Sequence, residues 1–444
     1  MRQDFTQGNI LKLILKTSYP MVIAFTLNLA YHLVDAMYVG WIGVEALAAV
    51  SFSFPVLFLM FALSAGIGTG STSLIARCIG AKKFHKANNA AEHAILIAII
   101  MGILFTMLGL IFAKDIFSIM GAGPDVMPLI LDYVNVIFAG AILFFITVTI
   151  NQILRGEGDM KNPMKIMLMI TLINIILDPI FIFALNMGVK GAALATVISM
   201  GIGCIFALTK LFRKDATLQL NLREFHYSPS ILKEIFKVGI PTSLSEVTMS
   251  VSMFMMNIIV AGFGTNAMAA FGIGFRLDTV AVMPAIGVMT AVISMTGQNI
   301  GARLFDRVKK IALIASALTA SYMSVIGILF FLFSKYFVIV FNKTPEVVAN
   351  GISYLKIIPL GYPFAGVGIV IAGILLGAGK SIQSLSLNVL RTIIISVPAA
   401  YFLSLKYGLN GVWMGIVIAS VVANIVAVIW YKNINWENTK PIED

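Results

Sequence analysis

Two aspartates lie within long apolar stretches, and these are the side chains best placed for ion chemistry. Asp35 stands in the run Ala30–Val39, and Asp178 stands in Ile173–Pro179, directly before a proline. An ionisable side chain at membrane depth is costly and usually marks an ion or substrate pathway. Two carboxylates on neighbouring helices would bind a hard cation such as Na⁺, or would carry protons. The residue types do not distinguish Na⁺ from H⁺ as the bound ion.

Polar side chains recur at helical spacing around each aspartate. Tyr31 and Asn28 precede Asp35 by four and seven positions and share its helix face. Asn174 precedes Asp178 by four positions and shares its face in the same way. A threonine early in the next helix is expected at a comparable depth. Either aspartate could instead reach the membrane interface or cap a helix. The predicted ion site consists of Asp35, Asn174, Asp178, Tyr31, Asn28 and Thr196.

The second half of the chain carries a different set of charged residues. The two halves are related by an internal repeat, in which the counterparts of the two aspartates are Met256 and Ala399, so the acidic pair is not duplicated. The second-half candidates are Glu246, Arg276 and Asp278. Arg276 and Asp278 are two positions apart and do not face each other on a regular helix. An ion pair between Glu246 and Arg276 would be either structural or functional.

Composition indicates that most of this surface does not face water. Of the 444 residues, 59% are hydrophobic and only 11% are charged, against about 25% charged residues in soluble proteins. The net charge of +11 does not indicate a nucleic-acid partner, because the basic residues gather in alternate short loops. The chain is therefore expected in a lipid bilayer, without nucleic acid as a partner.

Long apolar runs separated by polar breaks predict twelve transmembrane helices in an all-α integral membrane protein. A bilayer span needs about 20 apolar residues. A polar segment from Arg213 to about Glu234 separates two groups of six helices. The expected spans are 13–39, 46–76, 90–113, 128–152, 163–186 and 190–212, then 237–262, 267–297, 309–333, 349–376, 384–405 and 410–431.

The distribution of basic residues predicts the orientation. Lysines and arginines concentrate in alternate breaks and in the central segment, which are therefore expected in the cytoplasm. With an even number of spans, both termini fall on the same side. We expect a multi-pass protein of the inner, cytoplasmic membrane with both ends in the cytoplasm. The diagnostic residues are Arg77, Lys82, Lys83, Lys86, Arg155, Lys161, Lys165, Arg213, Lys214, Arg223, Arg303, Arg307, Lys309 and Lys310.

The internal repeat has one fixed offset, which is the distance in sequence from Pro20 to Pro241. At this offset Ile79–Phe84 resembles Ile300–Phe305. Each copy contains six spans, and because this number is even, the two copies have the same orientation in the membrane. Such parallel repeats are common in transporters, in which the substrate path lies between the two helix bundles. The predicted lobes are residues 1–222, with the cation site, and 223–444.

Two prolines are predicted to bend their helices. Pro20 lies inside the first span and Pro241 inside the seventh. A proline inside a helix removes a backbone hydrogen bond and bends the chain. Bending of the first helix would move Asp35 relative to its neighbours and so couple ion binding to conformation. A static bend is an equally good interpretation.

These residues resemble the multidrug and toxic compound extrusion (MATE) family, within the MOP-type fold, and its DinF-like prokaryotic branch in particular. The resemblance covers nearly the whole chain. It rests on Pro20, Asp35, Val39–Ala49, Ala76–Lys82, Gln152–Asp159, Asn174 and Asp178–Pro179. It implies an antiporter with two six-helix lobes that open alternately to each side of the membrane. It also implies that Asp35, Asn174 and Asp178 bind the coupling Na⁺ or H⁺, with amphipathic organic cations as substrates.

Other functions fit the residues less well than multidrug export. A flippase for a lipid-linked or other amphipathic metabolite with an anionic head group would need several basic residues inside the spans, and Arg276 is the only one expected there. An enzyme would need a nucleophile, of which none accompanies His32 and Asp35. No nucleotide-binding or metal motif is present, and the four histidines lack metal-ligand spacing. The chain is expected to act as a monomer without a cofactor and without enzymatic activity.

Overall fold

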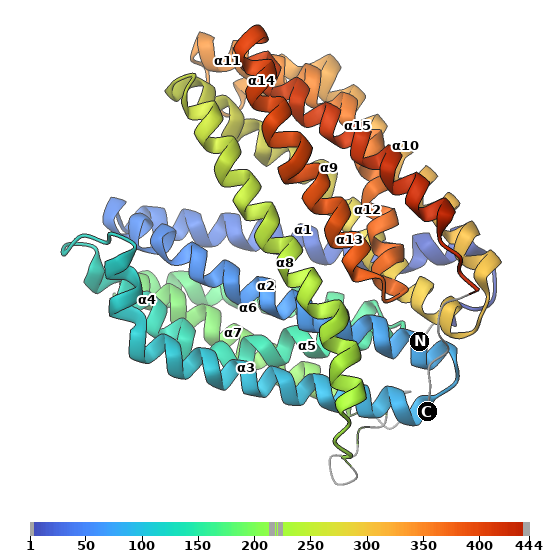
Figure 1. The fold of residues 1–444 in the computed structure, drawn as a ribbon. Coiled ribbons are helices and arrows are strands. Elements are labelled where there is room, and N and C mark those ends of the chain that lie inside the picture. The colour runs from blue at the N-terminus through green and yellow to red at the C-terminus, as the bar shows by residue number, and fades with distance from the viewer. Residues whose placement is uncertain (1–3, 213–217, 219, 221–224, 438–444) are drawn as a thin grey trace. The chain divides into compact units, whose positions relative to one another are not determined.

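The computed structural model describes residues 4–212, 218, 220 and 225–437, except the side chains of residues 30, 32 and 33. Within these residues the regular structure is helical throughout, with no strand (Figure 1). This confirms the predicted all-α fold. The basic residues Arg213, Lys214 and Arg223, which contributed to the predicted orientation, lie outside the described residues.

Six spans in the first half are assembled from seven α-helices and one π-helix. Two of them are composite: α4 and α5 form one bent span, and α6 continues into the π-helix η1. The bounds are α1 Ile10–Ile42, α2 Val44–Gly80, α3 Phe84–Ile119, α4 Met127–Ala139, α5 Ala141–Glu157, α6 Lys161–Pro179, η1 Ile180–Ala184 and α7 Gly188–Leu211.

The second half repeats this plan with its own interruptions. A 3₁₀ turn joins α11 to α12, and a π-helix joins α13 to α14. The bounds are α8 Pro229–Ala261, α9 Thr265–Gly301, α10 Phe305–Ile339, α11 Pro345–Ile357, η3 Ile358–Gly361, α12 Tyr362–Gly377, α13 Ser381–Val389, η4 Leu390–Ser396, α14 Val397–Tyr407 and α15 Leu409–Asn433.

The number of membrane spans agrees with the predicted twelve. Eleven helical segments of the described chain are long and apolar enough to cross a bilayer, and the bent pair α4–α5 makes the twelfth. The two parts of that pair meet at 50° around Gly140. A Cβ at Gly140 would stand 2.5 Å from Cγ2 of Val197 on α7, so the absence of a side chain lets α7 pack against the bend.

The internal repeat is visible in the backbone. Most residues with a positive backbone angle φ have a counterpart in the other half of the chain, at the offset of the internal repeat, whose φ is also positive. Lys82 and Arg303 have φ values of 60° and 58°, although neither is a glycine. A non-glycine residue in this region is uncommon, because its Cβ is crowded against the backbone. Gly158 and Gly379 form another such pair, at 92° and 74°. The same turns therefore end the same helices in both halves.

The chain divides into two compact units. The first unit is Ile23–Ser243, and the second unit joins Phe5–Val22 to the chain from Leu244 onward. Two changes of unit fall inside helices, two positions after Pro20 in α1 and two positions after Pro241 in α8. This differs from the predicted boundary at residue 222, because sequence order does not reveal where the first turns of a long helix pack.

Close backbone contact holds the beginning of α8 in the first unit. A Cβ at Gly70 of α2 would lie 2.3 Å from the carbonyl oxygen of Ile235, so only glycine allows this approach. Arg77 forms an ion pair with Glu234 at 3.2 Å. The Ser243 hydroxyl donates to the carbonyl of Ala62 at 2.9 Å.

The first residues of the chain are held in the second unit by hydrogen bonds. The Phe5 side chain is fully buried. Its carbonyl oxygen accepts from Nδ2 of Asn299 at 3.0 Å and from Nη2 of Arg307 at 3.1 Å. Arg307 also donates from Nη1 to the carbonyl of Gly8 at 3.1 Å. These bonds explain why residues before the α1 proline belong with the second half.

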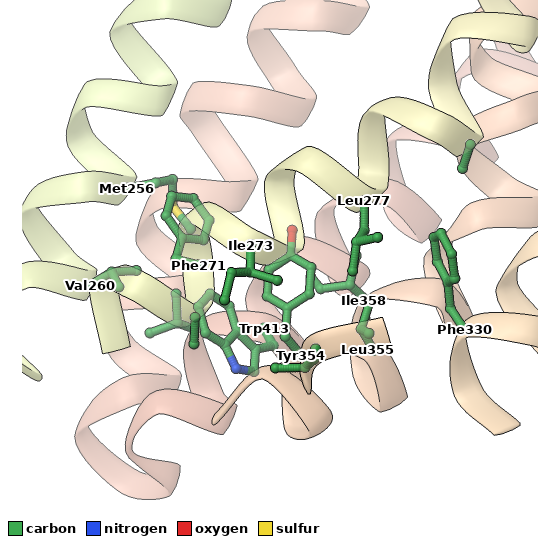
Figure 2. Packing of buried hydrophobic residues seen from close by; sticks show 14 of the residues in the cluster. Met256, Val260, Phe271, Ile273, Leu277, Phe330, Tyr354, Leu355, Ile358 and Trp413 are labelled. Carbon is green, nitrogen blue, oxygen red and sulfur yellow. The ribbon is translucent and has the colours of Figure 1, made fainter. Parts of the chain in front are cut away.

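An aromatic cluster forms part of the core of the second unit, as Figure 2 shows. The indole of Trp413, which is fully buried, stacks on Phe271 with ring centroids 5.7 Å apart and meets Tyr354 edge-on at 4.8 Å. Leu277 and Ile358 belong to the same cluster. The packing fixes the ring of Tyr354, whose hydroxyl bonds to Asp278.

Candidate functional site

Four of the predicted ion-site residues form one hydrogen-bonded chain in the first unit. Nδ2 of Asn174 donates to Oδ1 of Asp178 at 3.1 Å and to Oγ1 of Thr196 at 3.4 Å. The Thr196 hydroxyl lies 3.2 Å from the hydroxyl of Tyr31. The chain therefore connects α6 to α7 and α7 to α1. Asn174 and Asp178 have no exposed surface.

Asp35 belongs to the same site. It is partly buried and interacts electrostatically with Asp178 and with Tyr31. The two aspartates are therefore close enough to interact electrostatically, and their shared role in ion binding stays a prediction. Asn28 is partly buried, and its side chain makes no hydrogen bond among the described residues. The geometry gives Asn28 no place in the hydrogen-bonded chain.

Three oxygen atoms of the site are buried and have no hydrogen-bond partner in the described part of the protein. They are Oδ1 of Asp35, Oδ1 of Asn174 and Oδ2 of Asp178. An unpaired buried polar atom costs free energy, so it usually has a ligand, a water or a role in binding. Carboxylate and amide oxygens are ligands that hard cations prefer. The donor set therefore fits Na⁺, and the same carboxylates would accept protons.

Local sequence explains why the site forms on α6 and α7. Pro179 follows Asp178 directly, and the helix continues as the π-helix η1, a feature often found at functional sites. A Cβ at Gly191 would lie 2.7 Å from the backbone of Phe181, so glycine allows α7 to begin in contact with η1. This contact places Thr196, five positions further on, beside α6.

Tyr133 was not predicted and belongs to this site. It lies on α4, is only 5% exposed, and interacts electrostatically with Asp35, Tyr31 and Asp178. The repeat contained a signal, because the counterpart of Tyr133 in the second half is Tyr354. Each unit therefore has a buried tyrosine near an aspartate.

The second-half candidates do not form one cluster. Asp278 is held on α9 by two tyrosine hydroxyls: Tyr354 donates to Oδ2 and Tyr362 to Oδ1, both at 2.6 Å. Arg276 is exposed, and no ion pair joins it to Glu246 among the described residues. The ion pair expected between these two is therefore absent from this structure.

A second basic residue lies well inside a span and was not predicted. Arg391 stands in η4, near the middle of the span Ser381–Tyr407. The expectation that Arg276 is the only such residue was wrong. The sequence signal is a single arginine inside the expected span 384–405, with no acidic residue in that span to mark it as part of a pair.

A cavity of about 560 Å³ in the second unit contains none of the predicted site residues. Its walls carry four basic side chains, and one of them, Arg307, is already bonded to the carbonyls of Phe5, Gln7 and Gly8. Lys309 is paired with Asp306 at 3.2 Å. These bonds account for two of the basic groups, Arg307 as a support of the N-terminal segment and Lys309 as half of a local ion pair.

Twelve helical spans, an internal repeat of six spans and a buried pair of carboxylates define a polytopic membrane transporter. The MatE family model matches residues 20–180 and again residues 241–402, one match in each half. The chain belongs to the MATE family of multidrug efflux transporters. This confirms the family that the sequence resembled.

Known relatives cover nearly the whole chain. It is 28% identical over 438 residues to the "Probable multidrug resistance protein YpnP" of Bacillus subtilis, covering 98% of both chains. It is 27% identical to an "FAD transporter" of Shewanella oneidensis, covering 96% of this chain and 95% of the other. A solved structure described as the outward-facing conformation of a multidrug resistance MATE transporter superimposes with a TM-score of 0.93. That pair is 34% identical, with 96% of each chain covered.

Proposed function

We propose that this protein is a secondary antiporter that exports amphipathic organic cations in exchange for Na⁺ or H⁺ by alternating access. The observation that carries the proposal is the group of three unpaired buried oxygens on Asp35, Asn174 and Asp178. A bound cation would compensate these oxygens, and its loss would leave two buried carboxylates facing each other. The ion-bound and ion-free states therefore differ in electrostatic energy, which is what coupling requires.

The hydrogen-bonded chain suggests how the ion site influences the helices. Thr196 lies between Asn174 and Tyr31, so a change at the Asp178 carboxylate reaches α7 through two hydrogen bonds and α1 through a third. Pro20 lies earlier in α1, close to the point where the chain changes unit. We propose that ion exchange at Asp35 is coupled to bending of α1 near this proline.

The remaining expectations are part of the same proposal. The protein acts as a monomer in the cytoplasmic membrane, with both termini in the cytoplasm. It needs no cofactor and has no enzymatic activity. Its partners are a small cationic amphipath and the lipid bilayer.

A second candidate function is export or flipping of another amphipathic metabolite. The relative described as an FAD transporter favours it, because that description names a metabolite instead of a drug. Arg391 favours it as well, because it is a basic residue deep inside a span. The two candidates predict different substrates for the same transport cycle.

Transport by the purified protein in liposomes tests the proposal. A rhodamine dye whose carboxyl group is esterified, and which is therefore a cation, is followed under imposed Na⁺ or H⁺ gradients. Asp35→Asn and Asp178→Asn are expected to lower gradient-driven transport about tenfold or more. Asp115→Asn, which removes an exposed carboxylate from α3, is the matched control. Unchanged transport in both site variants would contradict the proposed ion site.

A further inference from the structure

Arg391 is a cation near the middle of an apolar span. It lies ten positions after Ser381, the start of α13, which corresponds to about 15 Å along the helix axis. Sixteen positions separate it from Tyr407, where the span ends. The side chain is partly buried. Arg391 therefore lies well inside the span, away from both of its ends.

A polar network holds the guanidinium in place. Nδ2 of Asn388, one turn earlier, donates to Oγ of Ser245 at 2.6 Å and to its carbonyl oxygen at 3.0 Å. These two bonds fix the amide, so its Oδ1 faces Arg391 and accepts from Nη2 at 3.4 Å. The bond is long, and it satisfies one of the five N–H donors of an arginine.

Arg391 belongs to an irregular, π-helical part of its span. Arg391 is the second residue of η4, in which each turn holds an extra residue. Ser252 of α8 donates its hydroxyl to the carbonyl of Thr392 at 3.0 Å. Thr392 in turn donates its hydroxyl to the carbonyl of Asn388 at 2.7 Å. Side chains of α8 and η4 thus stabilise an irregular turn that would otherwise be costly inside a membrane.

No acidic side chain in the described part of the chain forms an ion pair with Arg391. A buried charge is normally paired, because its removal from water is costly. Charged residues in membrane spans almost always face the interior of the bundle or a water-filled cavity, and they mark pathways. The protein keeps a fixed cation and supplies no anion from its described residues, so the missing partner is expected to come from outside the chain.

We propose that Arg391 binds the anionic group of a transported amphipathic molecule, a carboxylate or a phosphate, and that Asn388 positions it. The inference rests on the export function proposed above and specifies a substrate class. A planar guanidinium suits both groups, because it presents paired donors to two oxygens at once. The oxyanion belongs either to a soluble amphipath or to a lipid head group, and the chemistry of recognition is the same for both.

Two rhodamine dyes with one ring system provide the test. One has its carboxyl group esterified, and the other has a free carboxylate. Both are offered to wild type, Arg391→Gln, Arg391→Lys and Lys406→Gln in proteoliposomes. Arg391→Gln is expected to slow transport of the free acid about tenfold or more and to change transport of the ester less than about twofold. Arg391→Lys should retain an intermediate rate for the free acid.

Lys406→Gln is the matched control, because it removes an exposed positive charge near the end of the same span. Its transport of both dyes should stay near the wild-type rate. Equal losses for both dyes in Arg391→Gln would show a structural role and overturn the inference. Wild-type transport of the ester without the free acid would also overturn it, while leaving the proposed export function intact.

Two further measurements separate the remaining outcomes. If wild type transports neither dye, the proposed export of such cations fails, and binding of the free acid by fluorescence anisotropy decides the Arg391 site. Affinity about tenfold weaker in Arg391→Gln supports the site, and equal affinity overturns it. A fluorescent phosphatidylglycerol in the same liposomes tests the lipid source. Arg391-dependent flipping of that lipid would assign the anionic group to a head group.

Discussion

Tyr354 donates a hydrogen bond of 2.6 Å to Oδ2 of Asp278, and its ring packs in the aromatic cluster around Trp413 (Figure 2). Tyr362 donates to the other carboxylate oxygen at the same distance. Both oxygens of Asp278 therefore have partners, whereas Asp35 and Asp178 each have a buried oxygen without a partner in the described chain. The repeat places Tyr133 where Tyr354 stands, so the two units use related tyrosines in different ways.

Loss of a tyrosine hydroxyl at Asp278 should reduce stability. Tyr354→Phe leaves one buried carboxylate oxygen without a donor, and we expect the free energy of unfolding to fall by about 1–3 kcal/mol. Thermal unfolding of the purified protein in detergent measures this change. Tyr336→Phe, at a side chain that is 72% exposed, is the control and should unfold at the wild-type temperature. An unshifted midpoint in Tyr354→Phe would mean that the bond contributes little.

Removal of the hydroxyl at Thr196 should weaken ion binding without unfolding the site. Thr196→Val keeps the shape of the side chain but breaks the contacts with Tyr31 and Asn174. The contact with Asn174 orients an ion ligand, and its loss at about 1 kcal/mol should raise the ion concentration for half-maximal transport about fivefold. Thr209→Val, on the same helix but bonded only to the carbonyl of Phe206, should leave that concentration unchanged. A lower maximal rate with unchanged ion dependence would contradict the prediction.

An added methyl group at Gly70 should disrupt the contact between α2 and α8. The new Cβ of Gly70→Ala would lie 2.3 Å from the carbonyl oxygen of Ile235, which is backbone and cannot rotate away. We expect a loss of about 1–3 kcal/mol in the free energy of unfolding, because the helices must move apart. Gly40→Ala is the control, since nothing lies within 4 Å of its added Cβ. Equal thermal midpoints for the two variants would refute the close contact.

Substitution of Pro20 in α1 should lower the transport rate without changing the affinity for the dye. Pro20→Ala restores a backbone N–H donor inside the helix and removes the cause of a bend. If bending is part of the cycle, the initial transport rate should fall several-fold, whereas the dissociation constant of the esterified dye should stay within about twofold of wild type. Both quantities are measured with the same purified protein.

Pro55→Ala serves as the control for that experiment. Pro55 also lies inside a helix, α2, but it is far in sequence from the two positions where the chain changes unit. Its transport should remain near the wild-type rate. A wild-type rate in Pro20→Ala would leave the α1 proline as a static bend only.

The sequence alone was sufficient for the architecture of this protein. Apolar runs of the length of a bilayer and a fixed offset between the two halves predicted twelve spans in two related groups. Hydropathy depends on a few adjacent residues, and the offset is found by comparing one half of the sequence with the other, so neither feature requires knowledge of the tertiary contacts. Helical spacing also related Asn174 to Asp178, since positions four apart share a face whatever the rest of the chain does.

Only the tertiary structure decided which residues meet across helices. It brought Tyr133 within electrostatic range of the two aspartates, bonded Asp278 to two tyrosines from later helices, and formed no ion pair between Arg276 and Glu246 in the described chain. It also assigned the first turns of α1 and α8 to the opposite half of the chain. The physical reason is that these contacts depend on how helices rotate and bend at Pro20 and Pro241. Rotation is set by packing at positions such as Gly70, where the distance to another backbone, and not the residue type alone, determines what fits.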